Sequence, residues 1–357
     1  MYTGLRGVRT FVALPVLLLG PALAIAGPLT WGAEELVQAG IAPNVAPIWV
    51  PGYSVPSLAD WNNDGLPDLI VGEGSGAVAG KVRVYLNDGA PGAPHFNNPF
   101  YVQNGVGDLS VPGSGCMGTF PRVVQWDGDG KKDLVIGQAD GKVQWFHNLG
   151  TDAAPSYNGG TFVQVGQPGS KADINVGARA TPLIVDWNGD GKKDLVVGDL
   201  NGRIHVFINQ AADANAEPDF RTDAVLQQTG GGDLVVPSTA APGRASPVTL
   251  DVDRDGVFDL VSGDTDGKLV YYRNTGTNAA PAFGTYSLLQ ANGVDIDLGG
   301  TASALRSRPF VCDWTGDGVP DFLVGYGDGN IHLFQGVPEP TSLALMVVGG
   351  LTLLRRR

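Results

Sequence analysis

The chain contains little of what helical proteins and disulfide-rich domains are built from. Only 17% of its 357 residues are charged and two are cysteines, whereas 53 are glycine and 25 are proline. Glycine and proline interrupt regular elements, and one possible disulfide is no framework for a fold. The composition therefore favours a turn-rich, all-β protein, and we expect Cys116 and Cys312 to be unpaired thiols.

Basic charge and long apolar runs are also scarce. The formal net charge is −13, and an acidic surface disfavours binding to nucleic acid and unaided adhesion to anionic lipid. The two apolar runs at the ends of the chain are shorter than the roughly 20 residues that a membrane-spanning helix needs.

Residues 1–26 have the features of a signal peptide. Two arginines precede an apolar run over 11–19, and Ala24-Ile25-Ala26 fits a small-x-small cleavage site. The alternative is a membrane anchor, which the short run and its interruption by proline disfavour. We therefore predict that the chain is exported.

Residues 337–357 form a second distinct segment. Pro338-Glu339-Pro340 is followed by an apolar run over 343–354 and by three terminal arginines. This order resembles the PEP-CTERM sorting signals of Gram-negative bacteria, which implies handling by an exosortase-type machinery and membrane contact only through the tail. A plain tail anchor is the alternative, for which the apolar run is short.

An aspartate-rich loop recurs five times between these ends. Its copies start 61 to 65 residues apart and occupy 60–68, 125–133, 186–194, 251–259 and 313–321. A short apolar run precedes each loop, a second run that ends in glycine follows it, and a third, alternating run comes after a turn. Alternation bounded by glycine and asparagine is typical of strands.

A fourth element places an aromatic residue seven positions before a glutamine. Four copies follow the third runs, at 96–103, 157–164, 220–227 and 283–290, but the copy at 31–38 precedes the first loop. The last unit is complete only if this N-terminal copy joins it. We therefore predict one five-bladed β-propeller over 28–336, with four-stranded blades and a ring closed by the N-terminal strand. A linear solenoid would have no use for the N-terminal copy.

The loops follow the pattern Asp-x-Asx-x-Asp-Gly-x-x-Asp. Side-chain oxygens at positions 1, 3 and 5 of such a tight loop can converge on one cation, with position 9 closing the site, and calcium prefers six to eight oxygens. The alternative is that aspartate, asparagine and glycine merely favour turns. Because five copies agree in register, we predict up to five calcium sites.

This repeat resembles the FG-GAP and VCBS families, calcium-binding propellers found in integrin ectodomains and many bacterial surface proteins. The resemblance implies calcium ligands at positions 1, 3, 5 and 9 of each loop, which here are Asp60, Asn62, Asp64, Asp68, Asp127, Asp129, Asp133, Asp186, Asn188, Asp190, Asp194, Asp251, Asp253, Asp255, Asp259, Asp313, Asp317 and Asp321.

Two loops depart from the pattern. Gln125 replaces the first aspartate of 125–133, and Thr315 occupies the third position of 313–321. We expect these two sites to be weaker, and the site at 251–259, with four carboxylates, to be the tightest. The five loops together carry 16 carboxylates, which would repel one another without cations.

No familiar catalytic site can be assembled from the sequence. The four histidines are dispersed, and the variable repeat position that holds His205 and His332 is expected to be a solvated strand face. We expect close aspartate pairs to belong to the metal loops, which disfavours a catalytic pair. A tryptophan recurs at loop position 2, where we favour packing between blades over stacking on sugars.

These features favour a non-catalytic, exported, calcium-binding propeller. We expect a monomer at the cell surface or in the extracellular matrix of a Gram-negative bacterium, with a glycan or an extracellular protein as its partner. The alternative is a polysaccharide-degrading lyase or hydrolase on a calcium-stabilised propeller, since some polysaccharide lyases use related propellers.

Overall fold

The computed structural model describes residues 27–74, 80–114, 117–239, 242–299 and 306–338. The predicted signal peptide, Cys116 and the tail beyond residue 338 lie outside these ranges. Within them the regular elements are all strands, and no helix is present that could cross a membrane.

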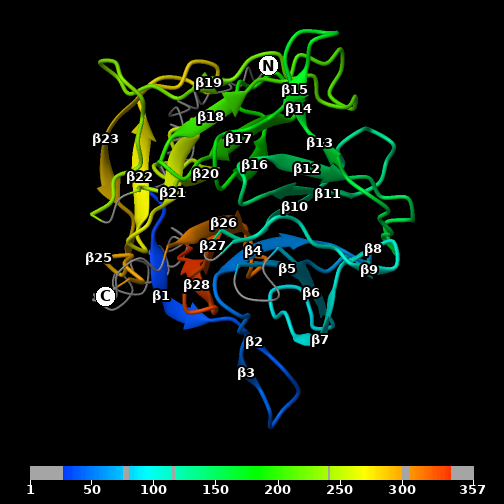
Figure 1. The fold of residues 1–357 in the computed structure, drawn as a ribbon. Helices are drawn as coiled ribbons and strands as arrows, with labels where there is room; N and C mark the ends of the chain where they lie inside the picture. The colour runs from blue at the N-terminus through cyan, green and yellow to red at the C-terminus, as the bar shows by residue number, and fades with distance from the viewer. Residues whose placement is uncertain (1–26, 75–79, 115–116, 240–241, 300–305, 339–357) are drawn as a thin grey trace, which may run out of the picture.

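The strands form five four-stranded antiparallel blades arranged in a ring (Figure 1). Blade 1 is β4 (Ser54–Ala59), β5 (Asp68–Glu73), β6 (Val82–Asn87) and β7 (Phe96–Tyr101). Blade 2 is β10 (Phe120–Val124), β11 (Asp133–Gly137), β12 (Val143–Phe146) and β13 (Thr161–Phe162). Blade 3 is β16 (Thr181–Val185), β17 (Asp194–Gly198), β18 (Ile204–Phe207) and β19 (Ala224–Val225). Blade 4 is β20 (Ser246–Leu250), β21 (Asp259–Gly263), β22 (Leu269–Asn274) and β23 (Phe283–Leu288).

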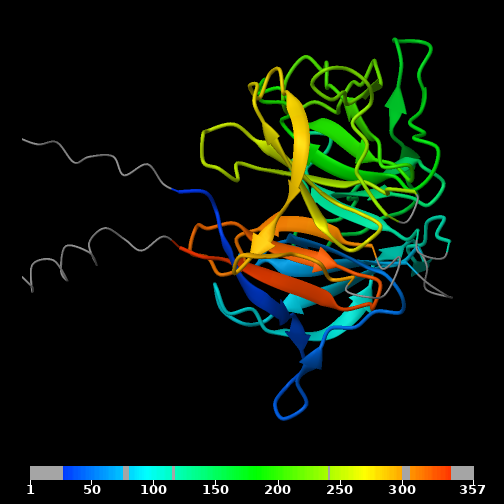
Figure 2. The same ribbon diagram turned by 90° about the vertical axis from the view of Figure 1, so that its left-hand side faces the viewer.

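Blade 5 joins the two ends of the chain. It consists of β26 (Arg308–Cys312), β27 (Asp321–Gly325), β28 (Ile331–Gly336) and the N-terminal β1 (Trp31–Leu36). β1 runs antiparallel to β28, with Glu35 opposite Leu333, and Figure 2 shows the blue strand beside the red one. The predicted five-bladed propeller and its closure by the N-terminal strand are therefore confirmed.

Short two-stranded ribbons extend from the outer strands. They are β2 (Gln38–Ala39) with β3 (Ala46–Pro47), β8 (Gln103–Asn104) with β9 (Gly107–Asp108), β14 (Gln164–Val165) with β15 (Ala172–Asp173), and β24 (Gln290–Ala291) with β25 (Val294–Asp295). The last ribbon also pairs in parallel with β1 and so links blade 4 to blade 5.

The core is divided into five clusters, one at each contact between consecutive blades. The second strand of every blade contributes side chains to two of these clusters, because successive side chains point to opposite faces of a sheet. In β5, Ile70 packs toward blade 2 whereas Leu69 and Val71 pack toward blade 5. Both faces of this strand are thus buried, which explains its uninterrupted apolar sequence.

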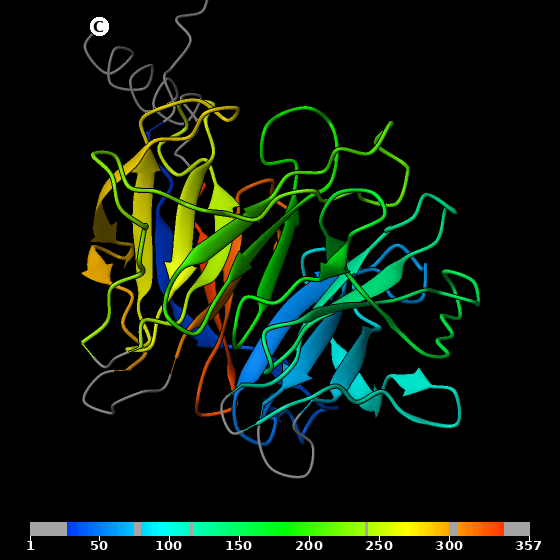
Figure 3. The same ribbon diagram turned by 45° about the horizontal axis from the view of Figure 1, so that its top comes forward.

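The glycine that ends each second strand is required by the close approach of the next blade. A Cβ added at Gly198 would lie 2.4 Å from the Ala245 carbonyl oxygen, and one at Gly325 would lie 2.2 Å from that of Ser54. Backbone atoms cannot give way as a flexible side chain can. The corresponding glycine of every blade lies equally close to a carbonyl of the next blade, including between blades 5 and 1, which are neighbours in the ring (Figure 3).

The loop tryptophans pack between blades, as predicted. Each contacts the aromatic residue of the fourth strand region of the next blade, with ring centroids 5.8 to 6.3 Å apart. The pairs are Trp61 with Tyr157, Trp126 with Phe220, Trp187 with Phe283, and Trp314 with Phe96.

The fifth interface exchanges the two sizes. At loop position 2 of blade 4 stands Val252, and the facing aromatic is Trp31, which belongs to the same core cluster. A small residue therefore faces the largest aromatic where the other interfaces pair tryptophan with phenylalanine or tyrosine. Each of the five interfaces thus holds one tryptophan, and at the fifth it comes from the fourth strand of the blade instead of the loop.

Candidate metal loops and the opposite face

The five aspartate-rich loops connect the first and second strands of the blades, so they lie on one face of the ring, the loop face. The turns between the second and third strands lie on the opposite face, the turn face. This division follows from the antiparallel order of each blade. The two faces carry different kinds of polar cluster.

The first aspartate of a loop holds the loop backbone in a tight turn. Its two carboxylate oxygens accept the N–H groups of positions 5 and 6 at 2.9 to 3.1 Å in the loops that begin with Asp60, Asp186, Asp251 and Asp313. At position 5, the carboxylate accepts the N–H of position 7 at 2.8 to 3.0 Å in all five loops. These bonds hold the loop in shape without a side chain from elsewhere.

The last aspartate of each loop is a buried anchor. It is 0% exposed in all five blades. One oxygen accepts the N–H of loop position 2 at 2.6 to 3.1 Å. The other accepts an N–H at the end of the third strand at 2.6 to 2.8 Å. The residues are Asp68, Asp133, Asp194, Asp259 and Asp321.

Burial raises the pKa of these five carboxyl groups, and a neighbouring loop carboxylate raises it further. The backbone N–H groups act in the opposite direction, because they stabilise the charged form. A buried carboxylate that lies beside other carboxylates is an environment that a cation stabilises.

Two groups of side chains bring their ligand atoms within 4.8 Å of one another. In blade 4 they are Asp251, Asp253 and Asp259, three predicted ligands of one loop. In blade 2 they are Asp127, Asp129 and His147. Acidic groups that could hold a metal ion are thus clustered in these loops.

His147 was missed by the sequence analysis. It lies near the end of the third strand of blade 2, and its Nδ1 is 2.9 Å from an Asp127 oxygen and 3.7 Å from one of Asp133. The signal was in the repeat: the corresponding position holds Leu86 in blade 1 and Arg273 in blade 4. Only the structure shows that this position points at the loop.

Arg273 pairs with two carboxylates of the loop at 251–259. Its guanidinium contacts Asp253, and its Nη2 lies 3.2 Å from Asp255. This side chain occupies the oxygens that a cation would use, so it must move before the loop can bind one through these groups. That this loop is the tightest calcium site remains a prediction. Arg273 competes with the cation for the same carboxylates and so disfavours tight binding.

The chemistry of the donors fits a hard cation in four loops. Those of blades 1, 3, 4 and 5 offer an aspartate at position 1, a neutral or charged oxygen at position 3, and aspartates at positions 5 and 9, which suit calcium. In blade 2, Gln125 replaces the first carboxylate and the His147 ring supplies nitrogen, a poorer ligand for calcium.

On the turn face, the expectation for His205 and His332 was wrong. Both are buried, at 9% and 6% exposed, rather than solvated. Nδ1 of His205 lies 2.9 Å from Asp223 and its Nε2 3.7 Å from Asp199. The two carboxylates outweigh burial and raise the pKa of His205 to about 9.

His332 is held in the same way by Glu34, at 2.7 Å, and by Asp328, at 3.3 Å. Variation at this repeat position therefore reflects different buried partners, not exposure to water.

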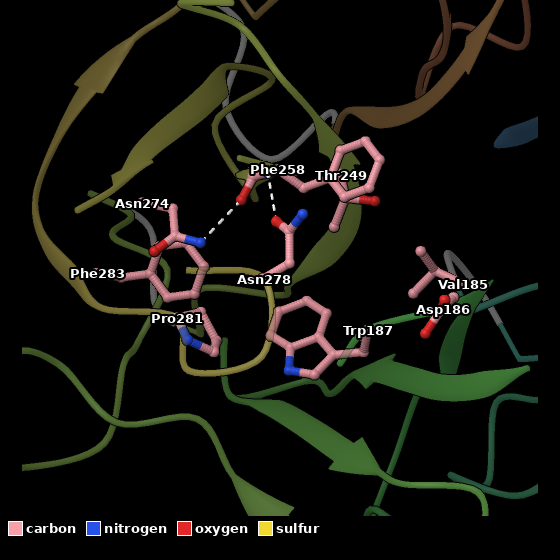
Figure 4. A pocket seen from close by; sticks show the side chains of 9 residues that line it. All are labelled: Val185, Asp186, Trp187, Thr249, Phe258, Asn274, Asn278, Pro281 and Phe283. Carbon is pink, nitrogen blue, oxygen red and sulfur yellow. Dashed lines mark hydrogen bonds between the residues drawn. The ribbon is translucent and has the colours of Figure 1, made fainter. Parts of the chain in front are cut away.

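A small pocket on the loop face lies at the Trp187–Phe283 contact between blades 3 and 4 (Figure 4). Its cavity volume is about 10 Å³, which is room for one water molecule at most. Asn278 Oδ1 accepts the Phe258 N–H at 2.8 Å and holds the pocket rim. The pocket is a packing gap at a blade interface.

Cys312, in β26, is a free thiol. Burial raises its pKa well above the usual range, and the neighbouring Asp321 and Asp313 act in the same direction. A protonated thiol is a poor nucleophile, so Cys312 is a packing residue.

Comparisons with known proteins point to one family of repeats. The FG-GAP-like repeat family matches residues 125–197 and 186–262. These matches support an FG-GAP propeller family. Human integrin alpha-7 is 33% identical over 162 residues, which amount to 42% of this chain and 12% of the integrin.

Solved structures match this chain at low similarity. The catalytic domain of the GH62 α-L-arabinofuranosidase of Coprinopsis cinerea matches with a TM-score of 0.46 and 10% identity, over 87% of this chain and 97% of that one. A putative glucose dehydrogenase of Thermus thermophilus matches with a TM-score of 0.37 and 10% identity, over the same shares. Neither similarity bears on the activity of this chain.

Proposed function

We propose that the chain is an exported, calcium-stabilised propeller that serves as a binding or scaffold protein at the cell surface or in the extracellular matrix of a Gram-negative bacterium. The observation that carries the proposal is the repeated loop: a pre-formed turn of carboxylates that ends in a fully buried aspartate. Such a cluster is stabilised when a cation neutralises it. Calcium would be held by the loop residues at positions 1, 3, 5 and 9.

Export and surface location are supported by the end segments and by the integrin similarity. The proposed domain plan is a signal peptide over 1–26, the propeller over 28–336 and a sorting tail over 337–357, with membrane contact only through that tail. FG-GAP repeats also occur in surface proteins such as integrins. The proposed partner is a glycan or an extracellular protein, bound by a monomer.

Thermal unfolding of the purified chain in calcium and in excess chelator tests the calcium part. A site that is saturated at 100 times its Kd stabilises the fold by about 2.7 kcal/mol. We expect the Tm to rise with calcium concentration and Asp190→Asn to reduce the rise. Glu35→Gln, which removes an exposed carboxylate outside the loops, is the matched control. An identical Tm in calcium and chelator would contradict the proposal.

Binding to a panel of polysaccharides, in calcium and in chelator, tests the role. Calcium-dependent retention on one glycan supports a lectin or adhesin. The same panel tests the alternative of a polysaccharide-degrading enzyme, because hydrolysis releases reducing ends and a lyase leaves unsaturated products. A chain that is folded in calcium and retained by no glycan would favour an extracellular protein as the partner.

A further inference from the structure

Each blade carries a pair of facing positions at the turn face. The first position directly follows the glycine near the end of the second strand. The second position lies in the third strand. In blade 1 the pair is Glu73 and Arg83, whose Nε lies 2.8 Å from the Glu73 carboxylate. In blade 3 it is Asp199 and His205, a histidine whose raised pKa keeps it charged at neutral pH.

The other paired blades use neutral or aromatic groups at the first position. In blade 2, Gln138 donates its amide N–H to Gln144 at 2.6 Å. In blade 5, Tyr326 packs edge-on against His332 with ring centroids 5.6 Å apart. Wherever blades 1, 2, 3 and 5 place a carboxylate at the first position, the third strand therefore supplies a cation.

Blade 4 breaks this rule. Its first position is Asp264, which is 1% exposed, and its third-strand position is Val270, which is 0% exposed and offers no polar atom. Oδ1 of Asp264 accepts the backbone N–H of Lys268 at 2.8 Å. Among the described residues no side chain donates to this carboxylate. Burial and the nearby Asp266 carboxylate raise the pKa of Asp264 to about 6, although the backbone N–H groups of Lys268, Gly267 and Asp266 act in the opposite direction.

A cavity lies where the missing partner would be. It has a volume of about 190 Å³, and Asp264, Val270 and Tyr286 are among the residues that line it. The Asp266 carboxylate, on the same wall, is held by the Ser238 hydroxyl at 3.1 Å and by the Thr239 N–H at 2.7 Å. This second carboxylate is thus fixed in position before any ligand arrives.

One basic residue, Lys268, is also among the residues that line the cavity, and its ammonium lies 4.0 Å from Asp297. Tyr286, in β23 at the edge of the blade (Figure 1), is 52% exposed and is among the residues that line the cavity. The cavity therefore combines two carboxylates, two hydroxyls and an aromatic ring.

We propose that this blade 4 pocket binds the ammonium group of an amino sugar, which takes the place that Arg83 and His205 occupy in their own blades. The inference rests on the proposed function, because it names a ligand class for that binding propeller. A charge-assisted hydrogen bond from the ammonium compensates the buried carboxylate. The Tyr286 ring adds an aromatic surface for the sugar, and the Ser238 and Thr239 hydroxyls, which donate to Asp266, keep lone pairs that accept hydrogen bonds from sugar hydroxyls.

An amino sugar fits better than a bare cation. The cavity exceeds what one ammonium fills, yet it is smaller than the pockets that enclose drug-sized ligands, which span about 300–1,000 Å³. A single pyranose ring that carries an amino group satisfies both limits. The exposed ring of Tyr286 also leaves room for the next sugar of a chain to continue into solvent.

Calorimetric titration of the purified chain in calcium with the β-1,4-linked trisaccharide of glucosamine tests the proposal. The N-acetylated trisaccharide, which has the same rings without the charge, is the matched ligand control. We expect at least tenfold weaker binding of the acetylated sugar. Val270→Arg, which places the arginine of blade 1 in the cavity, is expected to weaken glucosamine binding at least tenfold.

Asp264→Asn keeps the shape of the side chain and removes its charge, so it gives the same expected loss should Val270→Arg fail to fold. Equal affinity for the two trisaccharides, or full binding by either folded variant, overturns the proposal. So does selective binding of a lysine peptide without the sugar. If the chain binds another glycan in calcium and Val270→Arg does not affect that binding, the pocket proposal is wrong but the proposed function is retained. If calcium does not stabilise the chain and no glycan binds, the proposed function itself is wrong.

Discussion

Blades 1 and 4 share strand order and register, yet they satisfy their buried groups in different ways. Val71 pairs with Arg83 in blade 1, and Ser262 pairs with Val270 at the same place in blade 4. In blade 1 the arginine compensates Glu73, whereas in blade 4 the corresponding Asp264 borders a cavity. The repeated pattern thus gives both blades the same backbone arrangement. The side chain at one third-strand position then determines whether a buried carboxylate is paired or borders a cavity.

Blade 4 differs from blade 1 at two further repeat positions. Val252 stands where blade 1 has Trp61, and Arg273 stands where it has Leu86. The first exchange moves bulk to Trp31 in blade 5, and the second places a cation over the loop carboxylates. The following substitutions exchange the features of the two blades, from the largest expected effect to the smallest.

Arg83→Val makes blade 1 resemble blade 4 and should have the largest effect. Glu73 is fully buried, so loss of its cation leaves an uncompensated charge, and breaking such a pair costs about 3 kcal/mol. Tyr101 still donates its hydroxyl to Glu73 at 3.1 Å, which keeps the cost at the low end. Chemical denaturation should show the loss, and the double variant Glu73→Gln/Arg83→Val should recover most of it. Unchanged stability would show that the Glu73–Arg83 ion pair does not stabilise blade 1.

Val252→Trp gives blade 4 the tryptophan that the other blades have at loop position 2, but the interface around Val252 has no room for it. Trp31 already fills that interface at 2% exposed, so the added bulk should destabilise the fold by about 2 kcal/mol. Trp31→Phe in the same chain should compensate part of this loss, although it removes the bond from the indole Nε1 to the Pro320 carbonyl at 3.1 Å. A double-mutant cycle measured by denaturation checks the coupling, and strictly additive losses would contradict the exchange of volume.

Asp264→Asn should stabilise the ligand-free protein by about 1–2 kcal/mol at pH 7.5. The pKa of this carboxyl is near 6 in the folded chain and 3.8 in the reference state. The folded state therefore binds more protons between these values, and the contribution of Asp264 to stability falls as pH rises from about 4 to 6.

Unfolding free energies measured across this pH range check the sign for Asp264. The wild type should lose stability relative to Asp264→Asn as pH rises, with the difference constant above pH 7. A variant that is less stable than the wild type at pH 7.5 would show that the carboxylate is compensated without a ligand.

Arg273→Leu gives the loop of blade 4 the side chain of blade 1 and should have the smallest effect. The arginine side chain is 57% exposed, and exposed ion pairs contribute little to stability because water and salt screen them. Removing this competitor should tighten calcium binding at 251–259 by a few fold, as calcium titration would show. Ile208→Leu in blade 3, at the same repeat position without a charge, is the matched control. Weaker calcium binding by Arg273→Leu would contradict competition between the arginine and the ion.

Most of the fold could be predicted because five copies of one pattern constrain one another. The spacing of the loops, the glycines that end each second strand and the displaced aromatic element at Trp31 were enough for the number of blades and their closure. The packing role of Trp61 and its three counterparts also followed, since a residue repeated at one position of four blades meets an aromatic residue at the same place in each. Local periodicity and repetition are properties of the sequence itself.

What varies between the copies was decided only by the tertiary structure. His205 and His332 looked solvent-exposed because their repeat position is variable, yet both are buried and pair with carboxylates of the neighbouring strand region, Asp223 and Glu34, the second of which comes from the other end of the chain. For the same reason His147 and Arg273 reach the loops, and Asp264 meets no side-chain cation among the described residues. Whether a buried charge is compensated depends on which side chains meet in space, and that distance is set by the packing of strands and not by their order along the chain.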